Sequence, residues 1–146
     1  MIFSKEKPVS LYEAKIMDGL REHFEEALQY FPKDNIVGIF LQGSQNYELD
    51  YEGSDVDTKL IVVPSFKDIC LNRKPISTTH VRANDEHTDW KDIRLYMETF
   101  RKQNLNFLEI LFTDFYINHE HYLKRRTFFL ISGNVLIYII LRFFTD

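Results

Sequence analysis

Two aspartates two positions apart, Asp55 and Asp57, are the residues best suited to chemistry. Side chains of a strand alternate between its faces, so both carboxylates would point the same way, with their backbones roughly 6.5–7 Å apart. Adjacent carboxylates repel each other unless a cation lies between them. Oxygen-only ligands favour Mg²⁺ or Mn²⁺ over zinc. A solvated strand start, or an Asx turn at Ser54-Asp55, would explain an isolated pair equally well.

Gly43 and Ser44 form a second candidate group, directly after an apolar run at 36–41. Glycine allows a sharp turn and lets a ligand approach the backbone closely. The serine adds a hydroxyl and an amide that can donate to phosphate oxygens. Alone, such a pair is typical of a simple turn, so its value depends on what lies beside it.

The flanking elements predict how these groups meet. Branched and apolar residues at 36–41 and 56–63 predict two buried strands, the second ending at Pro64. If the strands are neighbours, the Gly-Ser turn and the acidic pair share one edge of a sheet, where metal ions could bridge bound phosphates. The face opposite the aspartates would carry Val56, Thr58, Leu60 and Val62.

The remaining elements are predicted from capping and periodicity. Ser10 begins a capping box before a helix that Pro32 ends, with an apolar stripe of Leu11, Ala14, Met17, Leu20, Phe24, Leu28 and Phe31. We also expect a short helix after Ser65, a strand around 78–82, and helices carrying the apolar residues of 93–100 and 107–115. This order indicates one α/β or α+β domain over 1–146, with helices packed on a small sheet.

Gly43-Ser44, followed by Ser54-Asp55-Val56-Asp57, resembles the signature of the DNA polymerase β-type nucleotidyltransferase superfamily. Residues 43–47, 54–59 and 106–112 are similar to those of small bacterial and phage nucleotidyltransferase-like proteins. The resemblance covers about 36–116, and 117–146 forms an apolar C-terminal segment beyond it.

The resemblance implies a mixed sheet with flanking helices and a transferase that uses Mg²⁺ or Mn²⁺. Such an enzyme moves a nucleoside monophosphate from an NTP, such as ATP, and releases pyrophosphate. Asp55 and Asp57 match the family's metal-ligand aspartates, and Gly43 and Ser44 match its phosphate-binding pair. Active members add a third carboxylate from a later strand, as catalytic group and metal ligand.

We favour Asp89 for that third carboxylate, with Asp92 as the alternative. Asp89 could instead cap the helix that begins near Ile93. The acceptor could be a protein, an RNA end or a small molecule. Two other functions fit the pattern: a catalytically inactive nucleotide-binding module, and an antitoxin-like interaction protein of the same fold.

The composition bears on nucleic-acid binding and on the cellular compartment. The net charge of −4 argues against a general nucleic-acid binder, and we expect no stable DNA binding. The one cysteine, Cys70, excludes an intramolecular disulfide framework and favours the cytoplasm. The start of the chain has no apolar core of signal-peptide length.

The stretch 128–141 carries no charged residue and is shorter than the roughly 20 residues that span a bilayer. A buried terminal helix or strand is favoured there, with a membrane-associated tail or a truncated chain end as alternatives. Such a segment could also join two copies of the chain. Members of the resembled family usually continue into a further helical region that helps to form the substrate pocket.

Five other polar positions could contribute to a site. His119 and His121 are favoured as surface residues over metal ligands, because no third ligand lies nearby in sequence. Lys59 shares the predicted strand face of the two aspartates and could neutralise a carboxylate or contact phosphate, or it could be an ordinary surface lysine of the strand. Glu109 lies in an apolar stretch, where a buried carboxylate would need a partner such as a lysine or arginine, unless it points outward. His87 is close to Asp89 and could touch the site, but it is favoured as a loop residue.

Overall fold

A computed structural model describes residues 2–5, 10–47, 54–102 and 104–119 of the chain. Its strands are β1 (Ile2–Phe3), β2 (Ile36–Gln42), β3 (Asp57–Val62), β4 (Ser77–Val81), β5 (His87–Asp92) and β6 (Tyr116–Asn118). Its α-helices are α1 (Leu11–Ala27), α2 (Phe66–Cys70), α3 (Ile93–Arg101) and α4 (Leu105–Leu108). Three 3-10 turns complete it: η1 (Lys33–Asn35), η2 (Ser44–Tyr47) and η3 (Glu109–Leu111).

The strands form one mixed six-stranded sheet in the order β1-β6-β2-β3-β5-β4. β2 pairs antiparallel with both β3 and β6, whereas β3 and β5 run parallel. The prediction of a small mixed sheet with flanking helices in an α+β domain is confirmed.

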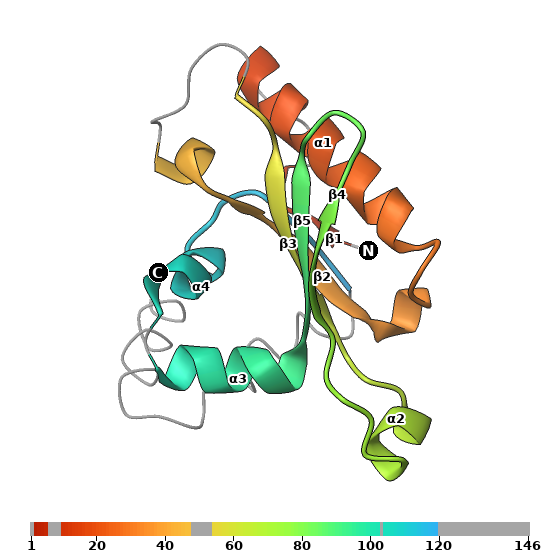
Figure 1. Ribbon diagram of the computed structural model, residues 1–146. Coiled ribbons are helices and arrows are strands. Elements are labelled where there is room, and N and C mark those ends of the chain that lie inside the picture. The colour runs from red at the N-terminus through yellow and green to blue at the C-terminus, as the bar shows by residue number, and fades with distance from the viewer. Residues whose placement is uncertain (1, 6–9, 48–53, 103, 120–146) are drawn as a thin grey trace.

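The two faces of the sheet are covered by different helices (Figure 1). The side chains of α1 pack on one face, against alternate residues of the strands such as Ile39, Leu60 and Trp90. On the other face, Val37, Phe40 and Ile61 pack against α3, α4 and η3. The second face is the one that carries the outward-pointing polar residues of β3 and β5.

α1 is shorter than predicted. Ser10 does cap it, accepting a hydrogen bond from the Glu13 N–H at 3.1 Å. The helix ends at Ala27, before Pro32, and Leu11 and Leu28 at its two ends are exposed. Chain residues just beyond it turn inward instead, and Phe31 packs edge-on against the Trp90 ring.

The predicted helix at 107–115 was wrong in its extent. Helical turns stop at Leu111, and β6 follows at Tyr116. The Thr113 hydroxyl bonds to Asn46 Oδ1 at 2.6 Å and accepts from the Phe115 N–H, which redirects the chain into the sheet. β5 was also missed as a strand, whereas β4 and α2 lie close to their predicted positions.

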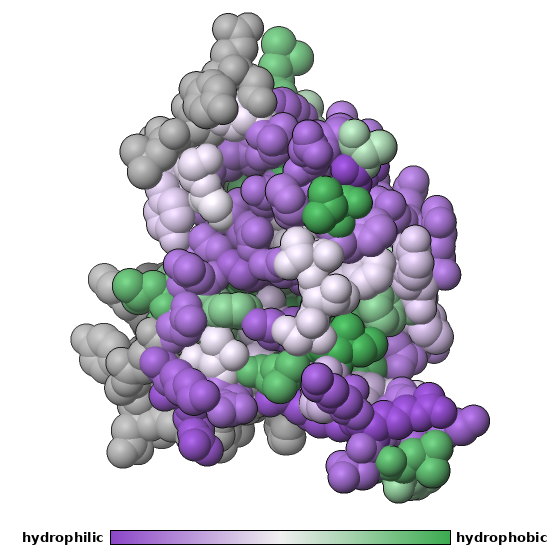
Figure 2. All heavy atoms as spheres, in the orientation of Figure 1, coloured by the Kyte–Doolittle hydropathy of each residue, from purple (hydrophilic) through white to green (hydrophobic). Residues whose placement is uncertain are grey.

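α2 projects from the end of β3, away from the sheet (Figure 1). Its capping box is formed as predicted, between Ser65 and Asp68. Figure 2 shows apolar side chains at this corner among hydrophilic ones, and Phe66, Ile69 and Leu71 are exposed. None of the helices in the described ranges is long and apolar enough to cross a membrane. The apolar stretch 128–141, with every prediction made for it, lies outside the described residues.

Candidate functional site

The backbone of Gly43 has a conformation that only glycine adopts easily. Its φ of +88° lies in the left-handed region, and a Cβ added there would meet nothing within 4 Å. Backbone conformation, not crowding, therefore requires glycine. Asn46 fixes the turn by donating from its side chain to the Leu41 carbonyl at 2.9 Å and from its backbone to the Gly43 carbonyl at 3.1 Å.

The turn lies beside the acidic pair, as predicted. Gln42, the last residue of β2, is the register partner of Asp57, the first residue of β3. Val56 is buried in the core beneath α1, and Asp57, the first residue of β3, lies on the opposite side of the chain. Asp55 is exposed and Asp57 is partly exposed.

His87 contacts Asp57 in two ways. Its backbone N–H donates to Asp57 Oδ1 at 2.8 Å, and its ring Nδ1 lies 3.4 Å from the same oxygen. His87 begins β5, so the prediction of a loop histidine was wrong. One carboxylate oxygen of Asp57 is therefore anchored, which orients the other.

Asp89 belongs to the same face of the sheet. It is the register partner of Lys59 across the parallel β3–β5 pair. Lys59 follows Asp57 by two residues on β3, so Asp89 lies one outward position further along the sheet than Asp57. Strand spacing puts the Cα atoms of Asp57 and Asp89 roughly 8 Å apart. Thr79 of β4 donates to Asp89 Oδ1 at 2.6 Å.

Asp92 has a different role. It lies on the opposite face of β5 and caps α3, accepting from the Arg94 N–H at 2.9 Å and pairing with the Arg94 guanidinium at 2.7 Å. The alternative in which Asp89 caps this helix is therefore wrong. Asp89 remains the better placed of the two aspartates for joining Asp55 and Asp57.

Two lysines add positive charge to this face. Lys59 and Lys91 both lie over the Phe107 ring, with their Nζ atoms 5.2 and 3.7 Å from its centroid. Burial lowers the pKa of Lys91, the nearby Asp89 carboxylate opposes that shift, and Lys59 adds to it. Lys59 pairs with the Glu109 carboxylate, and positive charge on this face favours the approach of an anionic ligand.

The donor set fits a metal ion that arrives with its ligand. No three His, Cys, Asp or Glu side chains in the described ranges are grouped closely enough to hold an ion by themselves. Mg²⁺ is usually bound by one or two carboxylates together with substrate phosphates, not by an all-protein cage. Asp55 and Asp57 match that pattern. The prediction that His119 is a surface residue was wrong: it is buried, with its Nε2 3.4 Å from Asp34 Oδ1, and His121 lies outside the described residues.

A network around the buried His23, which was not predicted from the sequence, holds the backbone between Asp55 and Asp57. Glu86 accepts from the Val56 N–H at 3.3 Å and pairs with the His23 ring at 3.0 Å and with Arg82 at 2.9 Å. The other ring nitrogen of His23 lies 2.8 Å from the Thr58 hydroxyl. His23 follows Leu20 by three positions on the buried face of α1, and that spacing is the signal that could have revealed it.

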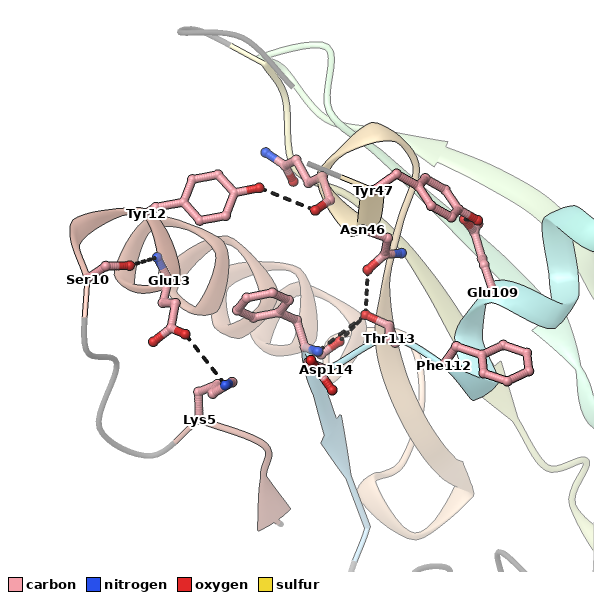
Figure 3. Close-up of a pocket in the computed structure, with 12 residues that line it drawn as sticks. Lys5, Ser10, Tyr12, Glu13, Asn46, Tyr47, Glu109, Phe112, Thr113 and Asp114 are labelled. Carbon is pink, nitrogen blue, oxygen red and sulfur yellow. Dashed lines mark hydrogen bonds and ion pairs between the residues drawn. The ribbon is translucent and has the colours of Figure 1, made fainter. Parts of the chain in front are cut away.

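A cavity of about 460 Å³ lies next to the Gly43 turn, between the start of α1, η2 and the segment that joins η3 to β6 (Figure 3). Tyr47 and Glu109 line it and also contact the candidate site. Gln45 lines it too, and its buried Oε1 has no hydrogen-bond partner among the described residues. The cavity offers room beside the turn for part of a ligand.

Comparisons with known proteins give no functional assignment for the chain. The chain matches no protein-family model, and a search of curated proteins finds no match either.

Proposed function

We propose that this chain is a metal-dependent nucleotidyltransferase domain that moves a nucleoside monophosphate from an NTP to an acceptor. One observation carries the proposal. The Gly43 turn and Asp57 are adjacent through the Gln42–Asp57 register, and Asp89 from the neighbouring parallel strand shares their face. A phosphate-binding turn beside two or three carboxylates suits phosphoryl-type transfer, which depends mainly on positioning and charge neutralisation.

Each group has a distinct role in the proposed reaction. The Gly43 turn and Ser44 bind the phosphates of the NTP. Asp55 and Asp57 would hold Mg²⁺ or Mn²⁺, which supplies charge stabilisation at the phosphates when bound. The acceptor hydroxyl attacks the α-phosphorus, its proton passes to Asp89, and the bond from that phosphorus to the bridging oxygen of pyrophosphate breaks.

The acceptor is a protein, an RNA end or a small molecule, and the setting that we propose is the cytoplasm. Cys70 is an exposed free thiol, which suits a reducing compartment.

The decisive experiment is incubation with labelled ATP, GTP, CTP or UTP and Mg²⁺ or Mn²⁺, with candidate acceptors from each class. We expect metal-dependent label transfer that the double variant Asp55→Ala/Asp57→Ala abolishes. Asp18→Ala is the matched control, because Asp18 is an exposed helix residue paired only locally with Arg21. Transfer that persists in the double variant would contradict the assignment of Asp55 and Asp57 to the site. Metal-dependent NTP binding without transfer to any acceptor would instead indicate a nucleotide-binding module.

A further inference from the structure

Three hydrogen-bond donors from three separate elements converge on the Glu109 carboxylate. The Lys59 ammonium of β3 lies 2.5 Å from Oε1. The Gly43 N–H, just after β2, donates to Oε2 at 3.3 Å. The Tyr47 hydroxyl of η2 donates to the same oxygen at 3.2 Å, and Figure 3 shows the Tyr47 and Glu109 side chains next to each other. These donors form an anion-binding site, hereafter the Gly43–Tyr47–Lys59 site, and the structure shows it with a carboxylate bound.

Two of the three donors in the Gly43–Tyr47–Lys59 site are also held by contacts other than Glu109. Lys59 also donates to the Asn106 backbone carbonyl and lies over the Phe107 ring, so its ammonium is held from other directions. Gly43 is fixed by the turn that Asn46 stabilises. Departure of the Glu109 side chain would therefore leave the Gly43 and Lys59 donors oriented toward an incoming anion.

Glu109 is carried by α4 and η3, whose packing on the sheet does not depend on its carboxylate. Ile110 is buried there, Phe107, Leu108 and Leu111 are partly buried against the same core cluster, and Leu105 and Phe112 at the ends of the segment are exposed. The Lys59–Glu109 pair is no strong source of stability, because desolvation of both charges offsets much of their attraction.

We propose that the Gly43–Tyr47–Lys59 site is a metal-independent phosphate site that Glu109 occupies until a phosphoryl group displaces it. The proposal rests on the proposed function, since it concerns the same Gly43 turn. A phosphoryl dianion carries more charge than a carboxylate and has three acceptor oxygens. It can therefore engage Gly43, Lys59 and the exposed Ser44 together, where a carboxylate has only two oxygens to offer. Glu109 thus selects multiply charged phosphate ligands over single carboxylates.

The test measures binding of inorganic pyrophosphate by calorimetry in the presence of a chelator, so that no metal ion contributes. Glu109→Gln removes the competing charge but keeps the size of the side chain. We expect this variant to bind pyrophosphate at least tenfold more tightly than the unmodified chain. Adding Lys59→Met to Glu109→Gln should abolish that gain. Glu98→Gln is the matched control, because Glu98 is an exposed helix residue paired with Lys102.

Glu109→Gln leaves Lys59 without its counter-charge, so circular dichroism must first show that the variant is folded. If it is not, Glu109→Asp takes its place, because the shorter side chain keeps the charge but cannot reach all three donors. A smaller gain in pyrophosphate affinity is then expected. Affinity that is unchanged or weaker in the folded variant would overturn the proposal and leave Glu109 as the structural partner of Lys59.

The two proposals fail separately. Metal-dependent nucleotidyl transfer without any gain in the Glu109 variants would refute only the role of Glu109. A gain in pyrophosphate binding in a chain that never shows metal-dependent NTP binding or transfer would refute the transferase and keep the anion site.

Discussion

Asp89 and Lys59 are register partners on the parallel strands β5 and β3, so the third candidate carboxylate stands beside a buried ammonium. Asp57 lies two residues before Lys59 on β3 and faces the same side of the sheet. Asp92 lies on the other face of β5 and pairs with Arg94. This arrangement separates two aspartates that are only three positions apart in sequence.

Replacing Asp89 should abolish chemistry and leave the fold intact. For Asp89→Asn we expect a loss of about 10²–10⁴ in transfer rate, the usual contribution of a general base. Asp92→Asn is the matched control, because asparagine also caps helices well. Its transfer rate should stay close to that of the unmodified chain. The measurement is single-turnover transfer from labelled NTP, and a loss confined to Asp92→Asn would move the third carboxylate to that residue.

The Gly43 turn should tolerate no ordinary side chain. Gly43→Ala forces an L-residue into the left-handed region, which costs about 1–2 kcal/mol. Since no atom lies within 4 Å of the added Cβ, the cost arises from the backbone alone. Gly43→Asn should cost less, because asparagine visits this region more readily. Urea unfolding followed by the fluorescence of Trp90, the one tryptophan, measures both; equal stability of all three proteins would contradict the role of φ.

Local signals predicted the elements that flank the Gly43 turn and the acidic pair. β2 and β3 are short runs of apolar and branched residues, and Ser65 carries its own capping box. β5 was not predicted because it is polar on both faces: of its buried residues Thr88, Trp90 and Asp92 only Trp90 is apolar, so the alternation typical of a strand is absent. β1 and β6 have two and three residues, and they exist only through pairing with distant parts of the chain.

The contacts that complete the site are also long-range. Lys59 and Glu109 are 50 residues apart in sequence, and His23 and Glu86 are 63 apart. A buried charge in an apolar stretch predicts that a partner exists, but only the packed fold selects which residue it is. For Glu109 the sequence left a lysine, an arginine or an outward orientation open, and in the structure its partner is Lys59.

The Lys59–Glu109 pair should show strong coupling in unfolding experiments. Lys59→Met alone leaves the Glu109 carboxylate buried with only neutral donors, and breaking a buried pair in this way costs about 3–5 kcal/mol. The double variant Lys59→Met/Glu109→Leu removes both charges and should be more stable than either single variant. Chemical denaturation of the four proteins gives the coupling free energy. Additive single effects would show that the two side chains do not depend on each other.

The buried His23–Glu86 pair makes stability depend on pH in a defined direction. Burial lowers the pKa of His23 below its ordinary value of 6.5, helped by the nearby Arg82 and opposed by Glu86 and Glu26. Burial would raise the pKa of Glu86, but hydrogen bonding, first from His23, outweighs it and lowers that pKa below 4.5. The two groups therefore act in different pH ranges.

Between the lowered pKa of His23 and pH 6.5, the unfolded chain binds a proton that the folded chain does not. The contribution of His23 to stability is thus fully present above pH 6.5 and is lost as the pH decreases below it, with a slope of at most about 1.4 kcal/mol per pH unit for this one proton. Glu86 adds a further loss only below its ordinary pKa of 4.5. His23→Gln keeps a hydrogen-bonding side chain but cannot titrate, so its unfolding free energy should fall less between pH 6.5 and 5. Identical slopes for the two proteins in urea unfolding across this range would contradict a neutral buried His23.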